Sequence, residues 1–198
     1  MPTIHYTVSM PQPQTHLFEV EVAVSGFDQV SYDFVMPSWT PGSYLIREFA
    51  RHVQEFQALD AASQQPLSWV KHSKNTWRVP APAGHNVILR YKVYAYELTV
   101  RTSHLDTSHG YFNGANLFVY LAGQRGHPVT LSIAVPYADW KVATGLPRLP
   151  VTLAAGNGAG NGSHEPEHHG FDTFLLNPRP PFQADDYDHL IDCPVECS

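Results

Sequence analysis

The sequence contains one literal zinc-binding pattern, His164-Glu165-Pro166-Glu167-His168. An H-E-x-x-H segment binds zinc when a helix places both histidines on one face, with the glutamate beside the metal as general base. Pro166 is compatible only with the first turn of a helix, and glycines at 160, 162 and 170 leave too few residues for a stable one. We therefore interpret His164, Glu165 and His168 as part of a His-rich surface loop and assign them no metal.

A second cluster holds the residue types of a hydrolase triad, namely Ser103, His104, Asp106, Ser108 and His109. A nucleophile, a base and an orienting acid rarely reach the required geometry within one ten-residue stretch. The sequence also lacks a G-x-S-x-G segment, which would expose a serine on a sharp turn. The pattern favours a polar loop between two strands.

The remaining candidate groups do not form a recognisable site. Cys193 and Cys197 are spaced C-x₃-C, which is neither a redox pair nor half of a typical zinc site. Asp185, Asp186 and Asp188 resemble part of a calcium loop but lack its glycine and its bidentate glutamate. We therefore predict no catalytic residue, no metal ligand and no cofactor in this chain.

The composition argues against several classes of protein. The 198 residues carry a formal charge of −6 and no run of Lys or Arg, so the electrostatic footprint of a nucleic-acid-binding protein is missing. No stretch approaches the roughly 20 apolar residues of a membrane-spanning helix, and the start lacks a signal-peptide pattern. These features predict a cytoplasmic location without membrane contact. Charged residues make up only 15% of the chain, so we expect part of the surface to face another domain.

Period-two alternation of apolar residues dominates the chain and predicts an all-β fold, an antiparallel β-sandwich. It recurs in residues 4–10, 18–24, 32–36, 87–95, 117–121 and 129–135, with Pro- and Gly-rich breaks between them. One short helix or helical turn is expected from Tyr44 to Val53, where apolar residues recur at helical spacing after Ser43, a suitable N-cap. Residues 154–170 predict a flexible loop, 171–176 a last strand and 177–181 an extended linker.

Three segments are more elaborate than strands require: 37–51, 93–102 and 187–196. In the first, the Pro41-Gly42 pair suits a type II turn, because glycine readily adopts a positive φ. The Trp, Arg and Glu side chains of the same segment are expected to form a buried polar network that anchors a corner. The residues that we assign to these structural motifs are Trp39, Pro41, Gly42, Tyr44, Arg47, Glu48 and Arg101.

Together the three segments resemble the amino-terminal domain of the M61 (glycyl aminopeptidase) family of zinc metallopeptidases. They read P-x-W-x-P-G-S-Y-x-I-R-E-F-A-R, V-Y-A-x-E-L-x-V-R and Y-D-x-L-I-D-x-P-V-E, and residues 140–144 add W-x-V-A-T. The resemblance covers residues 4–196. It implies a β-sandwich like that of the M1 aminopeptidases, followed by a thermolysin-like catalytic domain and, at the far end of the protein, a PDZ domain.

The resemblance also implies how this chain is divided. Residues 1–176 would form the sandwich domain, and residues 177–198 a linker and the start of the catalytic domain. The family's catalytic H-E-x-x-H lies beyond the third segment, so the segment from His164 to His168 does not align with it. Zinc is therefore expected only in the following domain.

The function that we expect is that of a non-catalytic scaffold and cleft wall, whose partners are the catalytic domain and the peptide substrate of the parent enzyme. In the related M1 architecture the junction strand offers an acidic group to the free amino end of the substrate. Here that group would be Glu196 or, as a second choice, Asp192. An isolated domain of this kind is expected to self-associate through its exposed interface.

The alternative is a free-standing carbohydrate- or peptide-binding β-sandwich. Such a module would use aromatic rings exposed on one face of a sheet. The candidates for this role are Tyr94, Tyr96, Tyr111, Phe112 and Tyr120.

Overall fold

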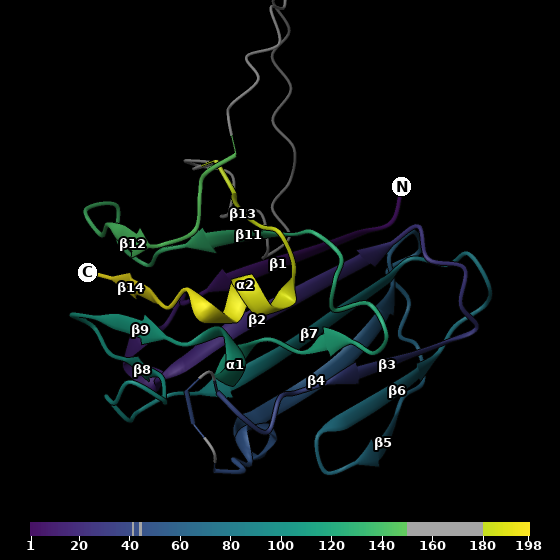
Figure 1. Cartoon of the computed structure of the whole chain (residues 1–198), viewed down its shortest axis with the longest axis horizontal. Coiled ribbons are helices and arrows are strands. Elements are labelled where there is room, and N and C mark those ends of the chain that lie inside the picture. The colour runs from purple at the N-terminus through teal and green to yellow at the C-terminus, as the bar shows by residue number, and fades with distance from the viewer. Residues whose placement is uncertain (41, 44, 150–179) are drawn as a thin grey trace, which may run out of the picture.

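The computed structural model of the chain describes residues 1–40, 42–43, 45–149 and 180–198, which form three β-sheets and a few short helical segments (Figure 1). The main sheet has six strands in the order β13 (Phe182–Ala184), β11 (Val129–Ala134), β1 (Thr3–Ser9), β2 (Leu17–Ser25), β7 (Val87–Tyr94) and β4 (Val53–Asp60). The facing sheet has the order β10 (Tyr120–Leu121), β3 (Ser31–Val35), β6 (Thr76–Pro80) and β5 (Val70–Ser73). The end sheet has the order β12 (Val142–Thr144), β14 (Val195–Cys197), β9 (Gly110–Phe112) and β8 (His104–Leu105).

The sandwich predicted from the alternation is confirmed, with one difference in strand direction. Most paired strands are antiparallel, but β1 and β11 run parallel, with Ile4 opposite Val129. The alternation itself is clearest in β2, where every second side chain from Phe18 to Val24 is buried. One face of the main sheet therefore faces the core and the other faces water.

The main sheet packs against both smaller sheets. The rings of Phe56 on β4 and Trp77 on β6 stack with centroids 5.1 Å apart, which joins the main sheet to the facing sheet. The rings of Phe18 on β2 and Phe112 on β9 meet edge to face at 5.4 Å, which joins it to the end sheet. A single hydrophobic core thus connects all three sheets.

The apolar run 117–121, predicted as a strand, forms one only at β10. Residues 114–117 form the short helix α1 (Gly114–Leu117), which begins where the Asn113 side chain accepts a hydrogen bond from the Ala115 amide. The Leu117, Phe118 and Val119 carbonyls accept hydrogen bonds from the hydroxyls of three buried tyrosines, Tyr91, Tyr187 and Tyr6 respectively. These bonds satisfy buried backbone oxygens that a strand partner would otherwise pair. Burial raises the pKa of all three tyrosines, so they stay protonated and able to donate.

Residues 180–198 pack into the same core, whereas residues 177–198 were predicted to form a linker and the start of the next domain. β13 pairs with β11, and β14 lies between β9 and β12. Between them, α2 (Tyr187–Asp192) buries Tyr187, Leu190 and Ile191. It approaches α1 so closely that a Cβ on Gly114 would lie 3.2 Å from the Ile191 Cα. The i, i+3, i+4 spacing of these three residues is typical of one buried helix face.

Of the short helix or helical turn predicted from Tyr44 to Val53, the described residues form one 3₁₀ turn at its end, η2 (Phe49–His52). Another 3₁₀ turn, η1 (Pro13–Thr15), lies between β1 and β2. Ser43 is not an N-cap, since η2 begins after Glu48 and that end has no side-chain cap. The apolar spacing did not correspond to one buried face, because Phe49 is buried while Leu45 and Ile46 are 63% and 85% exposed.

Candidate functional site

The Ser/His/Asp cluster forms a turn between β8 and β9, which confirms the predicted polar loop. Asp106 Oδ1 accepts hydrogen bonds from the Ser108 hydroxyl, the Ser108 amide and the His109 amide. The other carboxylate oxygen lies 3.1 Å from His104 Nε2. The donations from Ser108, followed by that from His104, hold the pKa of Asp106 well below its usual range. Because the Ser108 hydroxyl donates to a carboxylate rather than to a histidine, this turn does not place a serine for nucleophilic attack.

A line of polar and aromatic side chains crosses the end sheet from this turn. His109 Nε2 lies 3.2 Å from Glu196 Oε1 on β14, and Glu196 is 60% exposed. The His104 ring lies 6.0 Å from that of His109 and stacks on Tyr96 at 5.3 Å. The structure therefore connects Glu196, the predicted substrate contact, to Tyr96. Asp192, the second choice, is exposed at the end of α2.

Tyr96 also lines a pocket of about 440 Å³, which we call the Arg47 pocket. One wall comes from the segment before and within η2, and the other from the end of β7, the turn 97–103 and α1. The side chains that line it are Ile46, Arg47, Glu48, Phe49, Arg51, His52, Val93, Tyr94, Tyr96, Glu97, Thr102, Ser103 and Asn116. Its volume lies within the range of small-ligand pockets, which run from about 300 to 1,000 Å³.

Two side chains that line this pocket carry buried polar atoms with no hydrogen-bond partner among the described residues, Arg47 Nε and Asn116 Oδ1. Asn116 is 5% exposed, and its Nδ2 donates to the Arg101 carbonyl at 2.7 Å. This hydrogen bond fixes the orientation of the Asn116 side-chain amide and leaves its oxygen without a donor among the described residues. Nothing in the sequence around Asn116 indicated this position, because it depends on how α1 meets the turn 97–103.

The segment 37–51 forms the predicted turn but not the predicted polar network. Gly42 has φ +72°, and the Ser43 amide donates to the Thr40 carbonyl at 3.1 Å, which confirms the tight turn. Glu48, however, pairs on the surface with Lys74 at 3.0 Å instead of with Arg47. The expectation of a satisfied network was therefore wrong.

The other residues of the structural motifs are placed as follows. Trp39 is half-buried against the core, with the Arg125 guanidinium 5.3 Å from its ring centre. Arg101 is exposed, and its backbone carbonyl accepts a hydrogen bond from Asn116 in the pocket wall. Pro41 and Tyr44 lie outside the described residues.

Exposed apolar side chains occupy both loops beside the pocket. Leu45 is 63% and Ile46 85% exposed on one side, and Leu98 is 63% and Val100 78% exposed in the turn on the other. Single exposed apolar residues are ordinary, but four around one pocket indicate a surface that contacts another molecule or domain.

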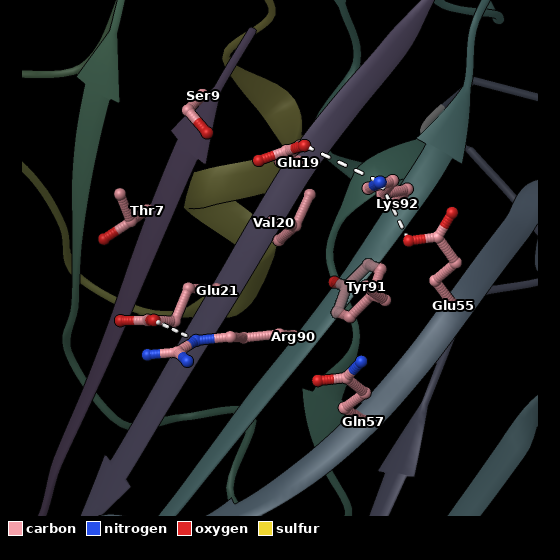
Figure 2. Close-up of a pocket in the computed structure, with 10 residues that line it drawn as sticks. All are labelled: Thr7, Ser9, Glu19, Val20, Glu21, Glu55, Gln57, Arg90, Tyr91 and Lys92. Atoms are coloured by element: carbon pink, nitrogen blue, oxygen red, sulfur yellow. Dashed lines mark hydrogen bonds and ion pairs between the residues drawn. The ribbon is translucent and has the colours of Figure 1, made fainter. Parts of the chain in front are cut away.

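A larger hollow, of about 540 Å³, lies on the water-facing side of the main sheet (Figure 2). Its charged side chains already pair across strands: Glu21 with Arg90 at 2.8 Å, and Lys92 with Glu55 at 2.8 Å and Glu19 at 3.8 Å (Figure 2). Such half-exposed cross-strand pairs stabilise a sheet modestly and leave little unmet charge for a ligand. The Arg47 pocket is therefore the stronger candidate, although it is smaller.

The remaining sequence candidates have structural roles or lie outside the described residues. Asp186 caps α2 by accepting from the His189 amide, and Asp188 pairs with Arg125. Cys197 is fully buried in β14. Within the described residues no three His, Cys, Asp or Glu side chains converge as they would around a metal ion, and the segment His164–His168 is not among them. Nor does this part of the chain contain a helix long and apolar enough to cross a membrane.

The five aromatic residues of the alternative binding module do not form one exposed face. Phe112 is fully buried, and Tyr120 packs on Tyr187 with ring centres 5.0 Å apart. Only Tyr94 and Tyr96 are exposed, and both line the Arg47 pocket. A continuous aromatic platform for stacking is thus not formed by these residues.

Comparison with known proteins identifies the family of this chain and solved structures similar to it. The family model of the peptidase M61 N-terminal domain matches residues 5–159. The crystal structure of an aminopeptidase N family protein from Idiomarina loihiensis is similar with a TM-score of 0.79 and 31% sequence identity. The similarity covers 99% of this chain and 29% of that protein, so this chain spans less than a third of its length. No curated protein matches the chain.

Proposed function

Since the chain belongs to the peptidase M61 family, whose N-terminal domain model matches most of it, we propose that it is the non-catalytic amino-terminal domain of a zinc metallo-aminopeptidase. The resemblance predicted from the three sequence segments is thereby confirmed at the level of the family. The observation that carries the proposal is the coverage: almost all of this chain corresponds to less than a third of an aminopeptidase N family protein. The zinc site and the general base would belong to the remainder of the parent enzyme.

Within that enzyme the domain acts as scaffold and cleft wall. The surface suited to this role surrounds the Arg47 pocket, where four exposed apolar side chains flank a cavity. Burying such side chains against a neighbouring domain is favourable by about 1.5–3 kcal/mol each. If the catalytic domain covered part of this face, the two domains would be held together. The Arg47 pocket would then lie at the edge of the substrate cleft between them.

The first test of the proposal combines metal content with peptidase activity. We expect the purified chain, after chelation and zinc re-addition, to hold no stoichiometric zinc and to show no turnover of glycyl or alanyl aminoacyl substrates. The parent enzyme, treated identically, should retain one zinc and hydrolyse them. One tightly held zinc per isolated chain, with hydrolysis abolished by His164→Ala, would refute the proposal and make the His-rich segment the active site.

The role of Glu196 in binding the substrate's ammonium group is a further part of this proposal. Its carboxylate is largely exposed on β14 and has a single side-chain partner, His109, among the described residues. A charge-assisted hydrogen bond is worth about 1.5–3 kcal/mol, so Glu196→Gln in the parent enzyme should raise KM for peptides by about tenfold or more. Asp192→Asn should have a smaller effect, and Glu55→Gln, on the outer face of the main sheet, none. Unchanged KM and kcat in Glu196→Gln would leave this residue with a structural role only.

A further inference from the structure

The Arg47 pocket contains one cation and one anion whose charged groups form no side-chain hydrogen bond or ion pair among the described residues, although the Glu97 charge acts on the nearby His52 ring. Two of its other charged groups are already engaged, because Glu48 pairs with Lys74 and the Arg51 Nε donates to His52 Nε2 at 3.0 Å. Burial, followed by the charge of Arg51, lowers the pKa of His52, so its ring is a neutral acceptor for that bond. The guanidinium of Arg47 and the carboxylate of Glu97 remain.

The position of Arg47 is fixed by its backbone rather than by its side chain. Its amide donates to the Ser38 carbonyl at 2.6 Å, which ties the segment before η2 to the loop that follows β3. The side chain is half-buried and its Nε is inaccessible and unpaired in the part of the chain that the structure describes. Leaving a buried charged donor unpaired costs about 1–3 kcal/mol or more, so an acceptor supplied from outside would be bound strongly.

The opposite wall offers acceptors. Asn116 Oδ1 is buried without a donor within the described residues, and Glu97 stands at the mouth of the pocket in the turn that follows β7. The same wall adds the apolar surfaces of Val93, Tyr94 and Tyr96. A ligand that fits must therefore present a carbonyl oxygen to Arg47, N–H groups to the acceptors and small apolar groups between them.

We infer that the Arg47 pocket binds the main chain of a short peptide, with a peptide carbonyl on Arg47 and peptide N–H groups on Glu97 and Asn116. A peptide main chain alternates these donors and acceptors, and its small side chains suit the apolar surfaces. Asn116 Oδ1 is inaccessible in this structure, so the proposed contact with it requires the Arg47 wall to shift when the peptide binds. This inference rests on the proposed function, because the peptide that binds here would be the substrate of the parent enzyme. In the parent, this pocket would be a substrate subsite in the cleft wall.

The test is binding of a blocked dipeptide, N-acetyl-alanyl-alaninamide, to the chain itself, followed by two-dimensional ¹H–¹⁵N NMR. We expect saturable shifts of the Asn116 side-chain amide and of the backbone amides of residues 47 and 97. Arg47→Met should weaken binding by about tenfold, and Arg47→Lys by less, because lysine keeps the charge but loses the planar fork. Glu97→Met should weaken binding severalfold, while Arg148→Met, an exposed arginine outside the pocket, should leave it unchanged.

Three results would overturn the inference. The first is the absence of NMR chemical-shift changes at millimolar peptide, and the second is shift changes that persist in Arg47→Met. The third is equal shift changes on addition of acetate, ammonium or methyl glucoside, which would indicate an ion or sugar site. Since the measurement needs neither zinc nor turnover, its failure would leave the assignment as an amino-terminal peptidase domain standing. Conversely, hydrolysis by the isolated chain would refute that assignment without affecting the binding result.

Discussion

Replacing Phe118 with alanine is expected to lower the free energy of unfolding by about 3–5 kcal/mol, the usual cost of removing a fully buried aromatic ring. Phe118 is inaccessible to solvent, with its ring centre 4.9 Å from that of Tyr6 and 5.9 Å from that of Phe112. It therefore fills the junction between β1 of the main sheet, β9 of the end sheet and α1. The cavity left behind cannot collapse easily, because tyrosine hydroxyls hold the backbone on both sides of it.

The measurement is urea unfolding followed by tryptophan fluorescence and by circular dichroism. Tyr137→Ala is the control, since that side chain is 42% exposed beside Trp140 and its loss should cost less than about 1 kcal/mol. Phe118→Leu should fall between the two, because leucine fills part of the cavity. If Phe118→Ala were no more destabilising than Tyr137→Ala, the packing described for this junction would be incorrect.

Four strands of the main sheet, β1, β2, β7 and β11, could be predicted because local alternation and burial coincide there, whereas β4, whose burial does not alternate, and β13 were not predicted. In β2, apolar residues at 18, 20, 22 and 24 alternate with residues that face water, so periodicity alone identifies the element. The run 117–121 offered no such contrast, since Leu117, Phe118 and Val119 are all fully buried. Its conformation depends on hydroxyls supplied by Tyr6, Tyr91 and Tyr187, which no local pattern reveals.

The candidate site could be predicted only in part. The segment 37–51 stood out as unusual, and its turn at Gly42 follows from glycine's tolerance of positive φ. Its partners could not be read from the chain, because the side chain of Glu48 contacts Lys74, 26 residues away, and Arg47 faces Asn116 across a pocket. The helical spacing of Leu45, Ile46 and Phe49 was misleading, since two of these side chains are exposed and suited to an interdomain surface.

The second large effect is expected at that surface. The double substitution Leu98→Asp and Val100→Asp should weaken the packing of this domain against the rest of the parent enzyme. The two side chains are 63% and 78% exposed here, so in the isolated chain the double variant should change stability by no more than about 0.5 kcal/mol. In the parent it removes two apolar contacts worth about 1.5–3 kcal/mol each and places two carboxylates against another domain. We expect faster proteolysis between the domains and a drop in kcat/KM of about tenfold or more.

Val30→Asp is the matched control for this experiment, because Val30 is 71% exposed in the turn before β3 and does not line the Arg47 pocket. It should leave both the isolated chain and the parent unaffected. Gel filtration adds a second measurement: if the isolated chain self-associates through this face, the double aspartate variant should be monomeric at concentrations where the unmodified chain is not. The opposite result would be equal activity and equal protease resistance of the double variant and Val30→Asp in the parent. That result would show that these loops do not contact the catalytic domain. The domain would then have to pack through another surface, and the end sheet around Glu196 is the next candidate.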